Sequence, residues 1–345
     1  MLIQYKGEGT IKSISTALNN LFRINKYYDF KGIDWCDIHL ERYEVRNIDI
    51  AIREIANSIN KNGKVVLNIR CKYIFDNSFS MVLINRFFSI LEWQRNKIIL
   101  IKNNYFSDIS IDSWTFGIIT AGKRNDYIKK IVSSIEKQNI PNYEIIICGN
   151  TSRIELDYKS NIHLVEFKEQ DDLGWITRKK NIIIEKSSFK NICILHDRYV
   201  LSDSWYSGFL DYGGDFDVIS LPQTYNDRQL PYWVENSANI NNPYDINEIK
   251  NEKYWSKNLY MPGGANVFKK SIAESNKYNE NLYWQQKEDI ELSRRHTLNG
   301  YMLRLNNKSS LEALFSHWKD PTKLGLAIKL IKKNILELKL KFNGF

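Results

Sequence analysis

The central part of the chain alternates short apolar runs with amphipathic stretches, a pattern typical of an α/β sheet. Residues 126–138 have helical spacing, because Ile128, Ile131, Val132 and Ile135 fall on one face. Strand and helix follow each other with short links, so we expect a mostly parallel sheet with ligands at the carboxyl ends of its strands. The predicted strands are residues 114–120, 143–148, 162–167 and 192–195, and the predicted helices are residues 126–138, 175–186 and 288–299.

Residues 191–203 (NICILHDRYVLSD) are the stretch around which the chain is organised. Four apolar residues, 192–195, predict a short buried strand, and His196, Asp197 and Arg198 follow it at once. A central strand of an open α/β sheet delivers polar groups to the crevice at its carboxyl end in this way. The alternative is a strand followed by a solvated turn.

Residues 1–110 are predicted to form a first, smaller α/β unit. Ile52, Ile55 and Ile59 recur at helical spacing, and Asn62-Gly63 is a helix stop signal. A polar, turn-rich stretch at 103–113 marks the boundary to the second unit. The elements expected in the first unit are strands within 32–38, 65–69 and 97–102 and helices within 47–61 and 81–93.

Residues 27–102 resemble the second half of class I methyltransferases, in which a helix and a glycine turn with a strand follow the cofactor site. The glycine-rich loop that would hold the cofactor through its backbone amides has no match. Gly7-Glu8-Gly9 lies at the very start of the chain, with no strand long enough before it. We therefore expect a degenerate unit with a structural or partner-docking role and no methyl transfer.

Composition and cysteine usage narrow the class of protein. A hydrophobic content of 43% and an aromatic content of 13% indicate a globular chain. The net charge of +9 suits phosphorylated substrates or an anionic membrane face, whereas the absence of arginine stripes and of any nucleic-acid-reading motif disfavours nucleic acid. The four cysteines (Cys36, Cys71, Cys148 and Cys193) form no Cys-x-x-Cys pair, so reduced buried thiols are expected.

We see no signal peptide, because the first residues lack a basic segment followed by a long apolar stretch. No run of about 18 apolar residues is present, so no membrane span is expected. Together with the unpaired cysteines, these features favour a cytoplasmic protein.

Six short motifs follow one another between residues 114 and 320. Their order carries more information than any one of them. They are Thr120-Ala121-Gly122-Lys123-Arg124, Cys148-Gly149-Asn150, Arg178-Lys179-Lys180-Asn181, His196-Asp197-Arg198, the glycine loop at 260–266 (YMPGGAN) and the acidic segment at 287–292 (KEDIEL). On these motifs, residues 114–320 resemble the family 2 glycosyltransferases, which have the GT-A fold.

The resemblance implies a Rossmann-like, mostly parallel GT-A domain over residues 111–320. It further implies an inverting enzyme that moves a sugar from a nucleoside-diphosphate sugar, a UDP-sugar in the first place, to a glycan or lipid-linked acceptor. The pathway it suggests is bacterial surface polysaccharide synthesis, meaning capsule, lipopolysaccharide or O-antigen. The donor-binding residues it implies are Thr120, Ala121, Gly122, Arg124, Asn150, Arg178, Lys180, Asn181, His196, Asp197 and Arg198.

The resemblance places a loop containing Gly263, Gly264 and Ala265 beneath the sugar; glycine lets backbone approach a ligand closely, although a simple tight turn is the alternative. Trp284 is expected either to stack on an acceptor ring or to pack in the core. Asp289 is the expected catalytic base and Glu288 the fallback. The alternative for both carboxylates is capping of the helix that begins there.

Glycosyl transfer must also neutralise a leaving diphosphate. A divalent cation, Mn²⁺ or Mg²⁺, held by carboxylate oxygens performs this task. The chain departs from the family's Asp-x-Asp pattern, with His196 in the first acidic position and Arg198 in the last. Either Asp197 holds the metal, with His317 as a distant ligand, or Arg198 supplies positive charge itself. The alternative for His317 is a core histidine packed among aromatic rings.

Two further segments carry predictions. Residues 225–258 are polar and without a clear period, so we expect an acceptor-binding loop or lid, or else a surface loop. Residues 321–345 have the spacing of a basic amphipathic helix, suited to peripheral contact with the anionic inner face of the cytoplasmic membrane or to packing on protein. The second class of function left open is a non-catalytic sugar-nucleotide or glycan binding module, in which Arg198 marks a degenerate metal site.

Overall fold

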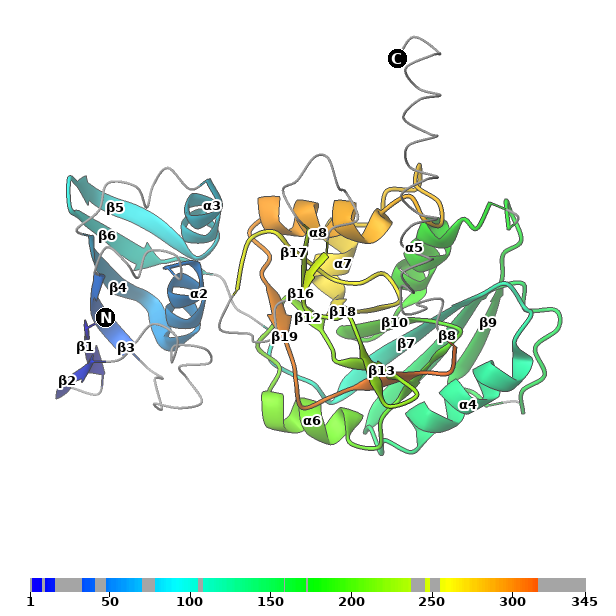
Figure 1. The fold of residues 1–345 in the computed structure, drawn as a ribbon. Helices are drawn as coiled ribbons and strands as arrows, with labels where there is room; N and C mark the ends of the chain where they lie inside the picture. Colours follow the sequence, from blue (N-terminus) through cyan, green and yellow to red (C-terminus); the bar gives the residue numbers. More distant parts are fainter. Residues whose placement is uncertain are drawn as a thin grey trace, which may run out of the picture.

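The structure is a computed structural model that describes residues 2–7, 10–15, 33–40, 48–69, 78–104, 108–157, 159–171, 173–236, 246–248 and 255–315. Two large sheets organise these residues, one of six strands near the N-terminus and one of seven strands after it (Figure 1). Three predictions fall outside the described residues: His317 as a metal ligand, the helix at 321–345, and a buried Cys71.

The six-stranded sheet is mixed. Only its central pair, β3 and β4, is parallel, and every other neighbouring pair is antiparallel. The strand order is β2-β1-β3-β4-β6-β5. The elements are β1 (Leu2–Gly7), β2 (Thr10–Ser15), β3 (Ile33–Leu40), α2 (Ile48–Ser58), β4 (Ile59–Ile69), α3 (Ser78–Phe87), β5 (Phe88–Gln94) and β6 (Lys97–Lys102).

Two predictions for this unit are wrong. Residues 81–93 do not form one helix, because α3 ends at Phe87 and β5 begins at Phe88. Strand β5 pairs antiparallel with β6 across a turn at residues 95–96, and this pairing overrides the local helical pattern. The second error concerns Gly7-Glu8-Gly9, before which no strand was expected. Strand β1 (Leu2–Gly7) leads directly into this segment.

The seven-stranded sheet has the order β19-β12-β18-β10-β7-β8-β9. Strands β10, β7, β8 and β9 run parallel, and β18 is antiparallel to its two neighbours. The predicted mixed α/β class with a mostly parallel sheet is confirmed. The strands are β7 (Ser113–Thr120), β8 (Asn142–Gly149), β9 (Ile162–Glu166), β10 (Asn191–His196), β12 (Val218–Ser220), β18 (Ala265–Lys269) and β19 (Leu303–Leu305).

Helices cover both faces of this sheet. The helices α5 (Ile176–Lys186), α7 (Lys270–Ser275) and α8 (Glu288–Leu298) lie on one face, and α4 (Asn125–Glu136) and α6 (Trp205–Tyr212) lie on the other (Figure 1). Helix α4 buries its predicted apolar face. Helix α5 approaches β7 closely at Gly117, where an added Cβ would lie 2.4 Å from Cγ2 of Ile183.

Two smaller sheets complete the second unit. The irregular loop predicted at 225–258 is partly wrong, because its described part contains short strands that pair with one another or with neighbouring segments. Its role as a lid stays a prediction. The strands of the smaller sheets are β11 (Tyr199–Leu201), β13 (Gln223–Tyr225), β14 (Arg228–Leu230), β15 (Val234–Asn236), β16 (Ile246–Glu248), β17 (Leu259–Tyr260) and β20 (Leu311–Ala313).

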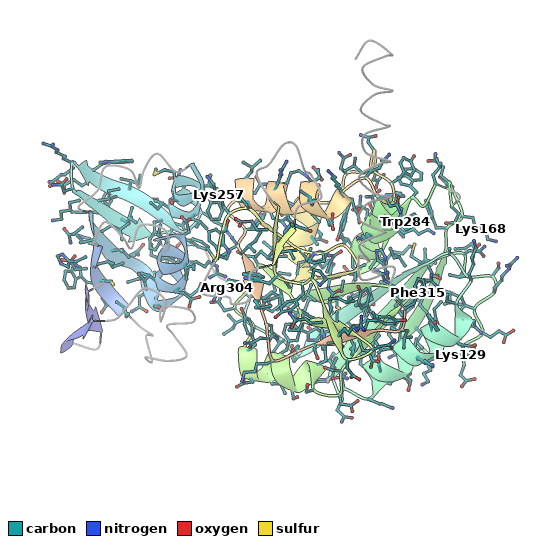
Figure 2. All side chains as sticks on the ribbon, in the orientation of Figure 1. Lys129, Lys168, Lys257, Trp284, Arg304 and Phe315 are labelled. Atoms are coloured by element: carbon teal, nitrogen blue, oxygen red, sulfur yellow. The ribbon has the colours of Figure 1, made fainter. Side chains whose placement is uncertain are left out.

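Buried ion pairs join the two units. Helices α2 and α3 face the larger unit (Figure 1), and Arg86 on α3 donates to both carboxylate oxygens of Asp217 at 2.7 Å. Arg304, labelled in Figure 2 on β19, donates to Glu54 on α2 at 2.6 Å. All four side chains are nine-tenths buried or more. These two ion pairs of the interface are therefore formed by charges that water hardly reaches.

Two simpler observations complete the fold. Cys36, Cys148 and Cys193 are buried and unpaired, as predicted. In the described residues, no helix has the length and apolar character needed to cross a membrane.

Candidate functional site

The first part of the site lies where β7 and β10 end. The Thr120 hydroxyl donates to Oδ2 of Asp197 at 2.8 Å and accepts the backbone N–H of Gly122 at 3.0 Å. Arg124 forms an ion pair with Oδ1 of Asp197, also at 2.8 Å. Both oxygens of Asp197 are thus engaged by the loop that follows β7, which brings together four residues predicted to bind the donor.

Glycines allow the neighbouring strand ends to approach each other. Gly122 has a φ of +72°, and a Cβ there would lie 2.3 Å from the carbonyl oxygen of Asn150. Only glycine adopts this conformation without strain. Ala121 is exposed and Asn150 is half-buried, with Ser152 donating to its side-chain oxygen at 2.9 Å. Contact of these residues with a nucleobase stays a prediction.

The glycine loop connects the end of β10 with the start of α8. The backbone N–H of His196 donates to the carbonyl oxygen of Gly264 at 3.0 Å. The N–H of Gly263 donates to Oδ2 of Asp289 at 3.0 Å, and an added Cβ on Gly263 would lie 2.7 Å from Oε1 of Glu288. The structure thus joins the strand tip, the glycine loop and the acidic pair in one continuous arrangement.

Asp289 has an environment suited to proton transfer. Its burial and the negative charge of Glu288 raise the pKa of Asp289 to about 6, against the opposing effect of Lys180 and two backbone N–H donors. A base with a pKa close to the working pH is the most effective one. The residue before the helix, Lys287, makes no side-chain capping bond.

Lys180 lies beneath the glycine loop. Its ammonium group is fully buried, donates to the carbonyl oxygen of Gly263 at 2.9 Å and lies 3.4 Å from Oε1 of Glu288. It also donates to the side chain of Asn266 at 3.2 Å and lies 4.7 Å from the ring centroid of Tyr278. These contacts place its charge beside the acidic pair, and its contact with a donor stays a prediction.

Two other residues of α5, Arg178 and Asn181, contact the segment that leads to α8. Asn181 donates to the carbonyl oxygen of Tyr278 at 2.9 Å and accepts the N–H of the same residue at 2.8 Å. Arg178 pairs with Glu280 at 2.9 Å. Both side chains hold this segment in place, and their contact with a donor stays a prediction.

Sequence reasoning did not find Tyr278 and Glu280, because their roles arise from contacts with α5 about a hundred positions earlier. Asn266 had a signal, since it stands at the end of the glycine motif. Its side-chain oxygen accepts from Tyr278 Oη at 2.6 Å. A buried polar group of this kind is fixed by its partners and has no local pattern.

The remaining predicted residues differ in exposure. Ala265 is buried and pairs with Leu195 in the sheet. Trp284, labelled in Figure 2, is 51% exposed, which rules out packing in the core. Its backbone N–H donates to the carbonyl oxygen of Gly174 at 3.0 Å. Stacking of Trp284 on an acceptor sugar stays a prediction.

The donor set at the strand tip does not fit a divalent cation. Metal sites of this kind need several carboxylate or carbonyl oxygens. Both oxygens of Asp197 are already bonded, and the next residue is Arg198. Within the described ranges, no three His, Cys, Asp or Glu side chains cluster closely enough to hold a metal ion. The proposed ligand His317 lies outside those ranges.

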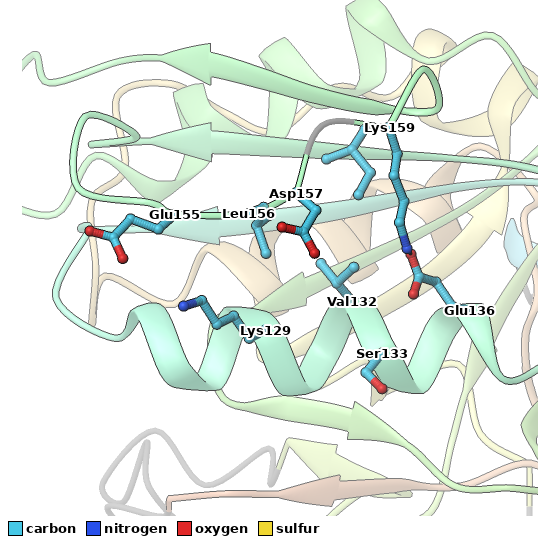
Figure 3. A pocket seen from close by; sticks show the side chains of 9 residues that line it. Lys129, Val132, Ser133, Glu136, Glu155, Leu156, Asp157 and Lys159 are labelled. Atoms are coloured by element: carbon cyan, nitrogen blue, oxygen red, sulfur yellow. The ribbon is translucent and has the colours of Figure 1, made fainter.

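A cavity of about 550 Å³ lies between α4 and the segment that precedes β9 (Figure 3). Lys129, Glu155 and Asp157 contribute charges of both signs to its lining, and an ion pair between Lys159 and Glu136 closes one side at 2.5 Å. None of its lining residues belongs to the predicted site.

No family model matches the chain, and no curated protein matches it. Solved structures of S. aureus TarS are similar to it. The structure of TarS residues 1–349 has a TM-score of 0.40 and 12% identity, covering 58% of this chain and 60% of that one. The same fragment in complex with UDP-GlcNAc has a TM-score of 0.42 and 14% identity, covering 60% of each chain. The chain thus spans about 60% of the TarS fragment, and 37% of the longer TarS structure.

Proposed function

We propose that the chain is an inverting glycosyltransferase that uses a nucleoside-diphosphate sugar. One observation carries the proposal: a single glycine loop is hydrogen-bonded at Gly264 to the tip of the central strand and at Gly263 to Asp289. The backbone of this loop therefore holds the tip of β10 and the carboxylate of Asp289 close together, at the carboxyl end of a strand in a mostly parallel sheet. Ligands of such sheets bind at this edge.

The residues divide the chemistry between them. The loop around Gly122, tied to Asp197 through Thr120, takes the nucleotide end of the donor. Asp289 accepts the proton of the acceptor hydroxyl. The hydroxyl oxygen meanwhile attacks the anomeric carbon from the face opposite the leaving diphosphate. General base catalysis of this kind contributes about 10²- to 10⁴-fold. Lys180 balances the charge of Glu288 and leaves Asp289 to act as the base.

The proposal includes the partners inferred from the sequence. The donor is a UDP-sugar in the first place, and the acceptor is a glycan or a lipid-linked glycan of bacterial surface polysaccharide synthesis. The proposed location is the cytoplasm, and the net charge of +9 supports contact with the anionic inner face of the membrane.

A panel of nucleotide sugars tests the proposal. The full chain is mixed with UDP-, GDP-, TDP- and CDP-sugars, and its thermal unfolding and the release of free sugar are measured. A matching donor present at 100 times its Kd is expected to add about 2.7 kcal/mol of stability. Nucleoside monophosphates serve as the control. If no member of the panel raises Tm or is hydrolysed, the proposal is wrong.

The second candidate is a non-catalytic sugar-nucleotide or glycan binding module. The engagement of both Asp197 oxygens by Thr120 and Arg124 favours it, because these bonds leave Asp197 no free oxygen for a cation. A transferase that required a metal ion at this position would then be inactive. Tight binding of a donor, without hydrolysis and without transfer to any acceptor, would support this candidate against the enzyme.

The proposal predicts a pH dependence. Asp289 must be deprotonated to act, and its pKa is raised to about 6, so kcat/KM is expected to fall as the pH drops below about 6. Lys180→Met removes a charge that lowers this pKa, so the acidic limb should move to higher pH by about one unit. The pH profiles of wild type and variant provide the measurement.

The control for this variant is Lys186→Met, at the exposed end of the same helix. It is expected to leave the acidic limb where it is. A purely structural role for Lys180 would lower activity equally at every pH and leave the limb unmoved, which would contradict the assignment.

A further inference from the structure

Arg198 lies in the turn directly after β10 and has no carboxylate partner among the described residues. Its contacts are with Tyr199, whose hydroxyl lies 3.5 Å from Nη2 and whose ring centroid lies 5.1 Å from Cζ. Among these same residues its Nε is buried and has no acceptor. Buried donors are nearly always satisfied, so this one marks the place of a missing acceptor.

A second unsatisfied nitrogen lies close by. Nε2 of His196 is buried and has no hydrogen-bond partner in the described residues. Burial, together with the positive charges of Lys180, Arg198 and Arg124, holds the pKa of His196 well below its usual value. In one tautomer of the imidazole, Nε2 carries the proton and is a hydrogen-bond donor.

The three cations around His196 are not equivalent. Lys180 is paired with Glu288 at 3.4 Å, and Arg124 is paired with Asp197 at 2.8 Å. Arg198 alone of the three lacks such a partner among the described residues. Its guanidinium group follows the carboxyl end of β10, and ligands of an α/β sheet bind at the carboxyl ends of its strands.

We propose that Arg198, with His196 beside it, binds the leaving diphosphate in place of a divalent cation. This rests on the proposed glycosyl transfer. A guanidinium group matches phosphate oxygens with two parallel N–H donors and keeps its charge at every working pH. Asp197 then serves to fix the nucleotide loop through Thr120 and Arg124 and is not a metal ligand.

The charge balance of the reaction agrees with this assignment. The bond between the anomeric carbon and the diphosphate oxygen breaks, and its electron pair stays on that oxygen. The acceptor oxygen forms the new bond, and its proton passes to Asp289. The negative charge that develops on the diphosphate is the charge that Arg198 stabilises, and fixed charges aimed at such a group are effective because they need no reorganisation.

Calorimetric titration of the full chain with nucleoside diphosphates (UDP, GDP, TDP and CDP) tests the proposal, first in EDTA and then in Mn²⁺. The wild type is expected to bind one of them in EDTA. Arg198→Gln should weaken this binding about 10- to 100-fold, which is the value of a charge-assisted hydrogen bond. Arg198→Lys should recover part of the loss. Arg95→Gln, in the exposed turn between β5 and β6, is the matched control.

Inorganic pyrophosphate is titrated in the same way. It distinguishes a failure of the proposed role of Arg198 from a failure of the proposed glycosyl transfer. Wild-type binding only in Mn²⁺, or unchanged binding by folded Arg198→Gln, overturns the role of Arg198 and leaves glycosyl transfer standing. Pyrophosphate binding that depends on Arg198, without binding of any nucleoside diphosphate, supports the anion site and overturns the transferase. Binding of neither probe by the wild type overturns both.

Discussion

Replacing Asp289 by Asn is expected to lower kcat by about 10²- to 10⁴-fold, the usual contribution of a positioned general base. The amide keeps the size of the side chain, and its oxygen still accepts the N–H of Gly263, so the glycine loop should stay in place. The –NH₂ group replaces the oxygen that accepts the N–H of Ile290. What is lost is the proton acceptor for the sugar hydroxyl. Initial rates with saturating donor and acceptor provide the measurement, and binding of the donor should be nearly unchanged.

Two further variants sharpen this prediction. Glu291→Gln, two residues along α8 and paired with Arg295, should keep kcat within about twofold, because its carboxylate is bound to Arg295 and takes no part in the proposed proton transfer. Glu288→Gln should cost less than the Asp289 variant, since Lys180 already neutralises Glu288. A larger loss at Glu288 would make Glu288 the base, and full activity of Asp289→Asn would remove the proposed mechanism.

Replacing Asp217 by Ala is expected to lower the free energy of unfolding by about 3 to 5 kcal/mol, since it removes a buried carboxylate that accepts from the buried guanidinium group of Arg86. Asp217 is 2% exposed and accepts both Nη atoms of Arg86, and Nε of Arg53 lies 3.7 Å away. The N–H of Met302 also donates to its carboxylate at 3.2 Å. Denaturant unfolding monitored by tryptophan fluorescence measures the effect.

The control is Asp211→Ala, whose carboxylate is half exposed and lies 3.8 Å from Lys308. Surface pairs contribute about 1 kcal/mol or less, so this variant should unfold like the wild type. Equal stability of the Asp217 variant would mean that the ionic contact does not hold the two units together.

The same carboxylate predicts a pH dependence of stability. Burial alone raises the pKa of Asp217, but Arg86 and Arg53 outweigh it and hold the pKa well below the unfolded value. The stabilisation is therefore present above the unfolded pKa of about 3.9 and is lost as the pH falls below it. Wild type should lose more stability between pH 5 and pH 3 than Asp217→Asn does.

The sequence predicted those parts of the fold that have a local cause. The spacing of Ile128, Ile131, Val132 and Ile135 placed α4 within two residues of its observed bounds, and the buried strand at 192–195 became β10. It also placed Gly263 and Asp289 in one site, because both stand in short motifs whose order along the chain is informative.

Features that depend on distant partners were not predictable in this way. Residues 81–93 satisfy a helical pattern, yet pairing with β6 turns their second half into β5. Lys180 was predicted only as a donor-binding residue, because a basic helix residue has no local sign of its partner. The structure places it against Glu288, 108 positions later. Contacts of this kind are decided by tertiary packing and leave no periodic trace.

The ion pair between Glu54 and Arg304 spans 250 positions, which has a consequence for how the chain matures on the ribosome. At about 5 to 20 residues per second, the partner of Glu54 is synthesised roughly 10 to 50 s after Glu54 itself. During this interval helices α2 and α3 have emerged without the surface that covers them. The nascent N-terminal unit is therefore the stage at which a trigger-type chaperone would be needed most.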